Sequence, residues 1–303
     1  MKAIVCTKYG SPDVLKLAEV KKPIPKDHEV LVKIYATTVS AGDIRVRSFD
    51  SPFMLWLPMR IVLGFRKPRK PILGVELSGQ IEAVGSNVKR FKKGDQVYAL
   101  TGMKFGGYAE YVSMSEGALM SLKPMNVTYE EAAAIPFGGT SALYFLRKGN
   151  IQAGQKVVVY GASGSVGSSA VQLAKHFGAE VTGVCSTANR DLVKSLGADY
   201  VIDYTTENFF NKSERYDIFF DAVGKLAKTK CEKALTQNGR YVTVDGQGIA
   251  KVRIEDLLYL TDLIESNTFK PVIDKRYSLE EVPEAHRYVE KGRKRGNVVI
   301  NIY

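Results

Sequence analysis

The sequence predicts an α/β protein in which a doubly wound parallel sheet follows a β-rich domain. Short β-type runs separated by Gly, Pro and charged turns fill the chain up to about Ser121, and their density is typical of a partly closed β-domain. From Lys156 onward, apolar runs alternate with helical segments, which is the pattern of parallel strands joined by crossover helices. Because 303 residues correspond to about two domains, we expect one domain from residues 1–122 with 267–303 and a second from residues 123–266.

The elements of the first domain follow one another as short strands. The expected strands are the runs "KAIVCTKYG", "EVLVKIYATTVS", "LSGQIEAVG", "DQVYALTG" and "GYAEYVSM". A helix follows in "TYEEAAAIPFGGTSALYFL", where Thr128 and Glu131 have the spacing of a capping box. Pro136 interrupts this pattern, so a second helix is expected to start near Gly139. The C-terminal stretch from Val272 has the pattern strand, helix, strand, and we expect it to return to the β-rich domain.

Five apolar runs predict the strands of the parallel sheet. They are "KVVVYGA", "EVTGVCS", "DYVIDY", "YDIFFDAVG" and "GRYVTVDG", and the helical segment before the fifth is "KLAKTKCEKALTQNG". The run from Val157 to Tyr160 is continuous, short and β-branched, as in a strand that is buried on both faces. Apolar residues from Val166 to Phe177 recur at helical spacing, and Gly178 suits the end of that helix.

A glycine-rich turn joins this first strand to this helix. Ala162-Ser163-Gly164-Ser165-Val166-Gly167 is an A-x-G-x-x-G variant of the dinucleotide-binding fingerprint, and Gly161 precedes it. In such a turn the glycines let the backbone approach a pyrophosphate, and the N–H groups of the helix N-terminus face the anion. A glycine triplet alone would also suit a sharp structural turn, but the flanking strands and helix favour a nucleotide site. The expected cofactor site also includes Tyr204 and Val223, near the ends of the third and fourth apolar runs.

The end of the second apolar run indicates which dinucleotide binds. NAD sites usually place Asp or Glu there for the ribose 2′-hydroxyl, whereas this chain has Cys185 and Ser186, followed by Thr187 and Arg190. Hydroxyls and a guanidinium suit a 2′-phosphate, because Arg makes planar, charge-assisted hydrogen bonds. The pattern therefore predicts NADPH.

Two further helix residues leave alternatives open at this end of the site. Lys194, one turn after Arg190, would add positive charge for a 2′-phosphate. Asp191 competes for a ribose contact, but it already lies inside the predicted helix. Arg190 and Lys194 would otherwise be ordinary solvated helix residues.

The composition excludes several classes of protein. The net charge of 43 − 32 = +11 is basic, and it concentrates locally in the runs 66–70 and 291–295. No nucleic-acid-binding motif accompanies these runs, so we expect no nucleic-acid partner. No apolar stretch is long enough to span a bilayer, and the N-terminus has a strand pattern rather than that of a signal peptide, so we expect a cytoplasmic protein. The chain has three widely separated cysteines, which argue against a disulfide framework.

Eight stretches together carry a family resemblance. They are "KAIVCTKYGSPDVLKL", "VSAGDIRVRS", "LGVELSGQIEAVGSNVKRFKKGDQVYAL", "GGYAEYV", "AAAIPFGGTSAL", the glycine-rich turn, "KSLGADYVIDY" and "RGNVVI". Over nearly its whole length the chain resembles the medium-chain dehydrogenase/reductase superfamily, and specifically its zinc-independent quinone oxidoreductase branch. The resemblance implies a Rossmann domain for the parallel sheet, a GroES-like catalytic domain for the β-rich part, and an oxidoreductase activity.

The zinc alcohol dehydrogenases of the same superfamily need ligands that this chain lacks. They place a catalytic cysteine near the position of Ser40 and Gly-His-Glu where this chain has Gly74-Val75-Glu76, and they carry a four-cysteine lobe that is absent here. The three histidines of the chain have no ligand spacing. We therefore expect no metal site, and hence no Lewis acid that would support simple alcohol oxidation.

The chemistry that remains is hydride transfer from NADPH to a substrate that can accept the hydride with little assistance from the protein. Quinones and α,β-unsaturated carbonyls fit, because conjugation spreads the charge that develops, and the cofactor carries the chemistry. The resemblance implies that Thr140 lies near the nicotinamide end and that Ser40 and Asp43 line the cleft opposite it. The strand leading to this cleft supplies the hydroxyls of Tyr35, Thr37 and Thr38.

Several of these residues also have a structural interpretation. Asp43 would cap a short helix, Ser40 would satisfy the backbone in a turn, and Glu76 would hold a hydrogen bond in the core. No residue is indicated as the acid of the reaction, so solvent is an alternative source of the proton.

Three functions remain open from the sequence. The first is an NADPH-dependent reductase of a quinone or enone, and the second is a zinc-free carbonyl or enoyl-thioester reductase on the same scaffold. The third is an NADPH-binding sensor or structural protein without significant turnover. The aromatic-rich stretch Phe49–Phe65, which includes Phe53 and Trp56, is either a lid over a greasy substrate or an ordinary surface loop.

The chain departs from the family after the fifth predicted strand. About five residues, Asp245–Ile249, separate "RYVTV" from "AKVRI", whereas a parallel neighbour needs a crossover of a dozen or more residues. Asp245-Gly246 is a hairpin-type turn signal, so "AKVRI" either runs antiparallel or forms no strand. Because the resemblance implies pairing of subunits along a sixth strand, we expect the usual homodimer to be weakened or absent, leaving a monomer or another kind of dimer.

Overall fold

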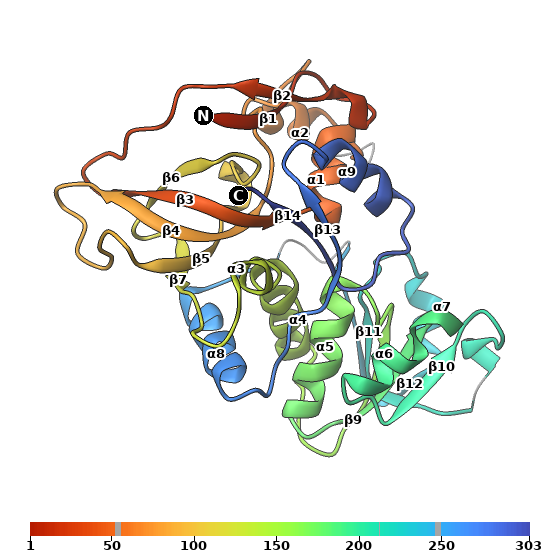
Figure 1. The fold of residues 1–303 in the computed structure, drawn as a ribbon. Coiled ribbons are helices and arrows are strands. Elements are labelled where there is room, and N and C mark those ends of the chain that lie inside the picture. Colours follow the sequence, from red (N-terminus) through yellow and green to blue (C-terminus); the bar gives the residue numbers. More distant parts are fainter. Residues whose placement is uncertain (52–55, 212, 246–249) are drawn as a thin grey trace. The chain divides into compact units, whose positions relative to one another are not determined.

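Two sheets of different kinds divide the chain into two units (Figure 1). A seven-stranded, largely antiparallel sheet belongs to the first unit, Met1–Pro136 with Ile273–Tyr303, and a five-stranded parallel sheet belongs to the second, Phe137–Val272. The computed structural model describes residues 1–51, 56–211, 213–245 and 250–303.

The first unit is built around its long strands β3 and β4. The strand order is β13-β14-β3-β4-β5-β7, with β6 also paired to β3, and only β13 and β14 run parallel within it. A separate antiparallel pair is formed by β1 and β2. Alternate apolar residues of β3 and β4 meet others in a buried core, as a sheet with one covered face requires. The bounds are β1 Lys2–Cys6, β2 Leu15–Glu19, β3 Glu29–Thr38, β4 Glu76–Val84, β5 Gln96–Leu100, β6 Tyr111–Ser115, β7 Leu119–Leu122, β13 Ile273–Ser278 and β14 Asn297–Asn301.

The helices of the first unit are short. The expected capping box is confirmed, because the Thr128 hydroxyl accepts from the Glu131 amide while the Glu131 carboxylate accepts from the Thr128 amide. The C-terminal strand, helix and strand are also confirmed, and β14 returns to pair with β3. The helices are α1 Ala41–Ser48, α2 Trp56–Leu63, α3 Tyr129–Ala133 and α9 Val282–Glu290.

The limits of the two units differ from the domain boundaries expected from the sequence. Residues 123–136 belong to the first unit, because α3 packs on β3 and β4. The ring of Tyr129 stacks on that of Tyr35 at 4.5 Å, and the Ser78 hydroxyl donates to the Tyr129 carbonyl. Residues 267–272 belong to the second unit, where the Lys270 amide donates to Gln172.

The second unit has the predicted doubly wound sheet. Its strand order is β10-β9-β8-β11-β12, and all pairs are parallel. The chain leaves β8 toward β9 on one side and later returns to β11 on the other, so the order reverses between β8 and β11. In such sheets, ligands bind outside the carboxyl ends of the strands at this switch point. The strands are β8 Lys156–Tyr160, β9 Glu180–Cys185, β10 Tyr200–Asp203, β11 Tyr216–Asp221 and β12 Leu235–Thr243.

Two expected helices of the second unit have different limits in the structure. The helix expected near Gly139 begins at Pro136, because proline lacks only a donor that the first helical turn leaves unused. The helical segment expected before the fifth strand shrinks to α7, Lys228–Glu232, because β12 already pairs with β11 from Leu235. The other helices are α4 Pro136–Lys148, α5 Ser165–His176, α6 Arg190–Ser195 and α8 Ile254–Glu265.

The short connection after β12 gives no sixth strand in the described residues. Residues 246–249 lie outside them, and residues 250–253 adopt no strand before α8 begins at Ile254. Within the described residues, β12 is therefore the edge of the parallel sheet. This agrees with the expectation that "AKVRI" forms no parallel neighbour.

We predict that the chain does not form a dimer with one parallel sheet continued through a sixth strand. A monomer, or a dimer through another surface, is expected because the strand that would pair is missing from the described edge. Light scattering coupled to gel filtration measures the mass in solution. A stable dimer joined through a parallel sixth strand would contradict this prediction.

Candidate active site

The glycine-rich turn connects β8 to α5, and the chain's own packing explains two of its glycines. Gly161 has φ +79°, and a side chain there would lie 2.4 Å from a methyl group of Val223. A Cβ atom at Gly167 would lie 2.0 Å from the carbonyl oxygen of Gly161, so α5 packs directly on the end of β8. Of the predicted loop residues, Gly161, Ala162, Ser163 and Gly164 form the turn, and Ser165, Val166 and Gly167 are the first residues of α5.

Packing within the chain does not explain Gly164. It is the N-cap of α5 with φ −79° and ψ 177°, a conformation that any residue adopts. The nearest atom to a Cβ at this position would be the Gly161 carbonyl oxygen at 3.5 Å, which is an ordinary contact. The missing side chain therefore leaves room outside the protein, in front of the helix N–H groups. A dinucleotide pyrophosphate fits this cradle, because anions bind at helix N-termini.

Three other predicted cofactor residues are close to this turn. Val223 packs on Gly161, and the ring of Tyr204 lies 6.2 Å from that of Tyr160 at the end of β8. Thr140 is buried on α4, whose first turn is close to α5, because a Cβ at Gly138 would lie 2.5 Å from the Ser165 hydroxyl. The structure thus brings these residues together at the switch point of the sheet.

The residues expected at the 2′-phosphate also meet the turn, through an asparagine that sequence reasoning missed. The Asn189 side-chain amide donates to the hydroxyls of Ser163 and Ser186, at 3.0 and 3.2 Å. The Thr187 hydroxyl lies 2.8 Å from that of Thr205. Asn189 directly precedes α6, and Asn is a common residue at the N-cap of a helix. Its position before the predicted helix was the sequence signal that could have identified it.

Arg190 and Lys194 lie toward opposite ends of the edge strand β10, although they are one helical turn apart. Hydrogen bonds from the hydroxyls of Thr187 and Thr205 lower the pKa of Asp203 at the carboxyl end of β10, and the charge of Arg190 lowers it further. The exposed Arg190 is therefore near this edge. The Lys194 ammonium instead donates to the Asp199 carbonyl at 2.6 Å, before β10 begins. The structure does not bring Lys194 to the other cofactor residues.

In the first unit, Ser40 and Asp43 form a capping box at the start of α1. The Ser40 hydroxyl donates to the Asp43 carboxylate at 2.6 Å and accepts from the Asp43 amide at 3.2 Å. The Ser40 amide also donates to this carboxylate, at 2.9 Å, and the Gly74 amide donates to its other oxygen at 3.0 Å. Both structural interpretations are therefore confirmed. Asp43 is fully buried, and its carboxylate accepts hydrogen bonds from these neighbours.

A buried polar network extends from Asp43 to α9. Burial raises the pKa of Asp43, and hydrogen bonds from the Ser40 hydroxyl, the backbone amides and the Tyr108 hydroxyl oppose this shift. His286 Nε2 lies 3.2 Å from the Tyr108 hydroxyl. Burial and the nearby charge of Arg47 lower the pKa of His286 to about 3, so His286 is neutral near pH 7. Because the Tyr108 proton points to Asp43, the Nε2 atom of His286 is the donor to Tyr108.

The strand hydroxyls of β3 are divided between two environments. Thr38 donates to the Glu76 carboxylate, and Thr37 donates to the Glu76 carbonyl at 2.6 Å, so the expected core hydrogen bond of Glu76 is confirmed. Tyr35 instead stacks on Tyr129, with Tyr303 at 5.7 Å. The structure therefore places Tyr35 in an aromatic cluster and not beside Ser40 and Asp43.

Lys294, just before β14, is a further residue that sequence reasoning missed. Its ammonium donates to the Gly296 carbonyl at 2.5 Å. Burial lowers the pKa of Lys294 to about 8, and the charges of Glu76 and Asp274 oppose this shift. No sequence pattern separates it from the neighbouring basic residues of "KGRKR".

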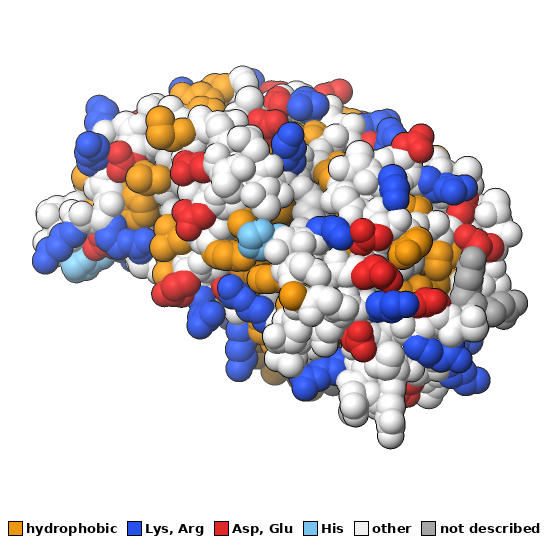
Figure 2. Space-filling model, turned by 90° about the horizontal axis from the view of Figure 1, so that it is seen from below, with side chains coloured by type: hydrophobic (Ala, Val, Ile, Leu, Met, Phe, Trp, Pro, Cys, Tyr) orange, Lys and Arg blue, Asp and Glu red, His pale blue; other side chains and the backbone are white. Residues whose placement is uncertain are grey.

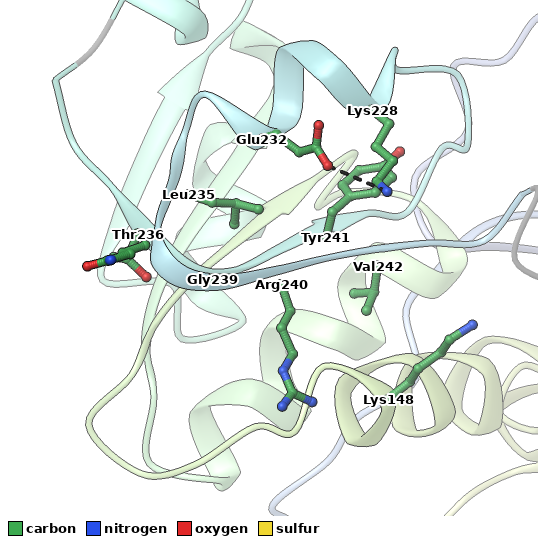
Figure 3. A pocket seen from close by; sticks show the side chains of 10 residues that line it. Lys148, Lys228, Glu232, Leu235, Thr236, Gly239, Arg240, Tyr241 and Val242 are labelled. Carbon is green, nitrogen blue, oxygen red and sulfur yellow. Dashed lines mark ion pairs between the residues drawn. The ribbon is translucent and has the colours of Figure 1, made fainter.

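A cavity of about 510 Å³ lies along β12, apart from the glycine-rich turn. Figure 3 shows Arg240 of β12 and Lys148 of α4 extending from elements on its two sides, and Lys228 paired with Glu232 at 3.5 Å. The cavity follows the edge strand and not the carboxyl ends of β8 and β11. The cavity is therefore separate from the candidate cradle at the turn.

Comparison with known proteins decides the family. Residues 26–124 match the alcohol dehydrogenase GroES-like domain, and residues 165–268 and 249–300 match families described as zinc-binding dehydrogenase. The chain is 38% identical to the 2-methylene-furan-3-one reductase of Solanum lycopersicum, over 99% of this chain and 79% of that protein. The chain belongs to the medium-chain dehydrogenase/reductase superfamily. Within it, the chain belongs to the quinone oxidoreductase-like branch and is an oxidoreductase.

Two other members of this superfamily are similar over almost the whole chain. The NADPH-dependent alkenal/one oxidoreductase of Arabidopsis thaliana, described as chloroplastic, is 35% identical, over 99% of this chain and 79% of that protein. The solved quinone oxidoreductase of Coxiella burnetii is 28% identical with a TM-score of 0.86, over 100% of this chain and 99% of that chain. The GroES-like and Rossmann expectations are thus confirmed.

The described residues contain neither a metal-binding cluster nor a helix that could span a membrane. Within residues 1–51, 56–211, 213–245 and 250–303, no three His, Cys, Asp or Glu side chains come together as a metal site would require. Among the helices of these same ranges, none has the length and apolar character needed to cross a membrane. Phe53, part of the stretch interpreted either as a lid or as an ordinary surface loop, lies outside the described residues.

The buried, neutral His286 predicts a specific sensitivity to acid. Its pKa falls from 6.5 to about 3 on folding, so the unfolded chain alone binds this proton between these values. The free energy of unfolding therefore falls as the pH drops through this window, by about 1.4 kcal/mol per pH unit. His286→Gln keeps a donor toward Tyr108 but does not titrate. We expect its loss of stability from about pH 7 to about pH 5 to be smaller by about 2 kcal/mol.

Urea unfolding of both proteins at the two pH values measures this difference. Trp56 is the only tryptophan of the chain and belongs to the same unit as His286, so its fluorescence reports the relevant unfolding. Equal acid sensitivity in the two proteins would contradict the assignment of a neutral, buried His286.

Proposed function

We propose that the chain is an NADPH-dependent oxidoreductase that transfers hydride to a quinone or an α,β-unsaturated carbonyl without a zinc ion. The observation that carries this proposal is the cradle at Gly164, where a missing side chain leaves room before the N-terminus of α5. The residues from Gly161 to Gly167 would hold the pyrophosphate. When bound, NADPH supplies the hydride, and the chain supplies orientation and binding.

The end of β9 supports NADPH over NADH. Cys185 and Ser186 stand where NAD sites usually carry an acid, and Arg190 is exposed near the same edge. Ser186, Thr187 and Arg190 would hold the 2′-phosphate by charge-assisted hydrogen bonds. The name of the Arabidopsis thaliana relative, which specifies NADPH, also supports this cofactor.

The proposed substrate class follows from the chemistry that the first unit offers. The Ser40 hydroxyl already donates its proton to Asp43, so it has no free proton for a substrate. Ser40 and Val75 stand where the zinc enzymes of the superfamily place a cysteine and a histidine. A conjugated acceptor needs neither a zinc ion nor a strong acid. The names of the Solanum lycopersicum and Coxiella burnetii proteins support unsaturated carbonyls and quinones.

The remaining site assignments are proposed on the family pattern. Thr140 would lie near the nicotinamide, with Ser40 on the substrate side and Asp43 holding Ser40 in place, whereas the stacking of Tyr35 on Tyr129 supports no role for Tyr35 beside Ser40. Tyr204 and Val223 would flank the cofactor, since they lie close to Tyr160 and Gly161, the last residue of β8 and the first residue of the turn. The proposed compartment is the cytoplasm, and the proposed partner is a small molecule.

One assay separates this proposal from the two alternatives. The protein is mixed with NADPH and a panel of quinones, enones, enoyl thioesters and aldehydes, and the loss of reduced cofactor is followed. We expect turnover of quinones or enones, and we expect the rate to be the same when a chelator is added. Elemental analysis should find no stoichiometric zinc. Turnover of aldehydes or enoyl thioesters alone would favour the carbonyl or thioester reductase. Tight NADPH binding without turnover would favour a sensor or structural role.

Gly164→Ala tests the cradle directly. The new methyl group fits the backbone and meets no atom closer than 3.5 Å, so the folded chain should lose only the stability that the N-cap preference for Gly over Ala provides. It would fill the space before α5, so we expect NADPH affinity to fall at least about tenfold. Gly117→Ala, at an exposed position with 3.7 Å of clearance in the other unit, is the matched control. Equal NADPH affinity in Gly164→Ala and the unmodified protein would argue against the cradle.

Arg190→Ala tests the cofactor preference. NADPH should bind the unmodified protein at least about tenfold tighter than NADH, which is about 1.4 kcal/mol. Arg190→Ala should remove most of this difference and leave NADH binding unchanged, because only NADPH carries the 2′-phosphate. Lys194→Ala is the matched control, since its ammonium contacts the Asp199 carbonyl, before the start of β10 and away from the carboxyl ends of the strands. Equal affinities for both cofactors in the unmodified protein would refute the preference.

A further inference from the structure

The stretch from Ser51 to Val75 combines apolar and basic side chains without a single carboxylate. The nearest acids along the chain, Asp50 and Glu76, stand just outside it. In a chain with 32 acidic residues, such a gap leaves this stretch with an unbalanced positive charge. Its cations are Arg60, Arg66, Lys67, Arg69 and Lys70.

Helix α2 and the residues after it expose large apolar side chains. Trp56 is 45% exposed, Leu57 and Ile61 are each 54% exposed, and Val62 and Phe65 are each 58% exposed. Leu57 and Ile61 are four residues apart, so they share one face of the helix. Single exposed apolar residues are ordinary on a protein surface, but five in so short a stretch form a patch that marks an interaction site.

The inner side of α2 is fixed to the first unit. The Arg60 guanidinium lies over three aromatic rings, 3.7 Å from the centroid of Phe49, 4.7 Å from Tyr9 and 5.0 Å from Trp56. The Tyr9 hydroxyl donates to the Gly64 carbonyl at 2.9 Å. These contacts fix one side of the helix to the rest of the first unit. The exposed apolar side chains of α2 therefore have defined positions.

A basic turn folds back beside this helix. Gly64 has φ +118°, and a side chain there would lie 2.3 Å from the Lys67 carbonyl oxygen. The Arg69 amide donates to the Leu63 carbonyl at 2.7 Å, which brings the turn against the end of α2. A hollow of about 390 Å³ lies in the turn. The exposed cations of this basic turn, which we define as residues 65–70, are Arg66, Lys67, Arg69 and Lys70.

We propose that α2 and the basic turn bind the surface of a membrane that contains anionic phospholipids. Tryptophan and aliphatic side chains on a short helix enter the boundary between headgroups and acyl chains, and neighbouring cations attract anionic headgroups. This stretch carries both features and no acid that would repel such a surface. The binding is peripheral, lies outside the glycine-rich turn, and does not depend on the proposed function.

Charge favours a lipid surface over a second copy of the chain. A two-fold contact through this patch would bring the same four cations of each subunit together, which is repulsive. Figure 2 shows one face of the molecule, on which both Lys and Arg and Asp and Glu side chains are exposed.

Flotation of the full chain with vesicles tests the proposal. We expect binding to vesicles of phosphatidylcholine mixed with phosphatidylglycerol to exceed binding to phosphatidylcholine alone at least about tenfold at low salt, and to weaken as salt is added. The emission of Trp56, the only tryptophan, should shift to shorter wavelength on binding, since its ring would enter the bilayer boundary.

Two variants and a matched control locate the binding surface. Replacing Arg66, Lys67, Arg69 and Lys70 with Gln should reduce binding at least about tenfold. The control replaces four exposed cations elsewhere, Lys92, Lys93, Lys291 and Arg293, with Gln, which changes the net charge equally and should leave binding nearly unchanged. Leu57→Ser with Ile61→Ser changes exposed residues, so it should leave the fold intact and remove the shift of the Trp56 emission.

Three outcomes would overturn the proposal. The first is no binding to the anionic vesicles, and the second is an equal loss of binding in the control, which would indicate attraction by net charge alone. The third is a Trp56 shift that appears without vesicles as the protein concentration rises, which would identify a second copy of the chain as the occupant. Circular dichroism of each variant establishes that it is folded.

Discussion

The close approach of α5 to β8 is the contact on which the candidate cofactor site depends. Only a hydrogen atom fits between Gly167 and the Gly161 carbonyl, because a Cβ would lie 2.0 Å from that oxygen. The contact holds the first turn of α5 over the end of the central strand, with its N–H groups directed outward. Val223, from the end of β11, then closes on Gly161 from the other side of the switch point. The space at Gly164 follows from this arrangement, since the helix start and the strand end are both fixed.

A second constraint governs the first unit, where hydrogen bonds link several buried polar side chains. Asp43 takes hydrogen bonds from Ser40, Gly74 and Tyr108, and Tyr108 in turn accepts from His286. Ser40 and Asp43, which the family resemblance places in the cleft, form the capping box at the start of α1. Such a site is consistent with a reaction that requires little chemistry from the protein side chains. The cofactor supplies the hydride, and the substrate delocalises the charge that develops.

The same unit carries a surface that this chemistry does not use. α2 is anchored by Arg60 among aromatic rings, while its outer residues and the basic turn stay exposed. Quinones and enones with apolar tails dissolve in membranes, so a reductase that rests on a lipid surface would meet its substrate at high local concentration. The positive charge of the chain thereby has a local role in addition to any general attraction of an anionic cofactor.

The sequence alone determined the elements whose signals are local. The β-branched run of β8, the glycines of the turn, and the Thr128 and Glu131 box each act within a few residues, so the parallel sheet and the dinucleotide fingerprint were predictable. Tertiary structure decided what depends on distant contacts. Lys194 and Arg190 are one turn apart in sequence, yet the hydrogen bond of Lys194 to the Asp199 carbonyl separates them. Asn189 joins Ser163 to Ser186, and Tyr35 is drawn into stacking on Tyr129, because the folded chain brings together residues that no local pattern connects.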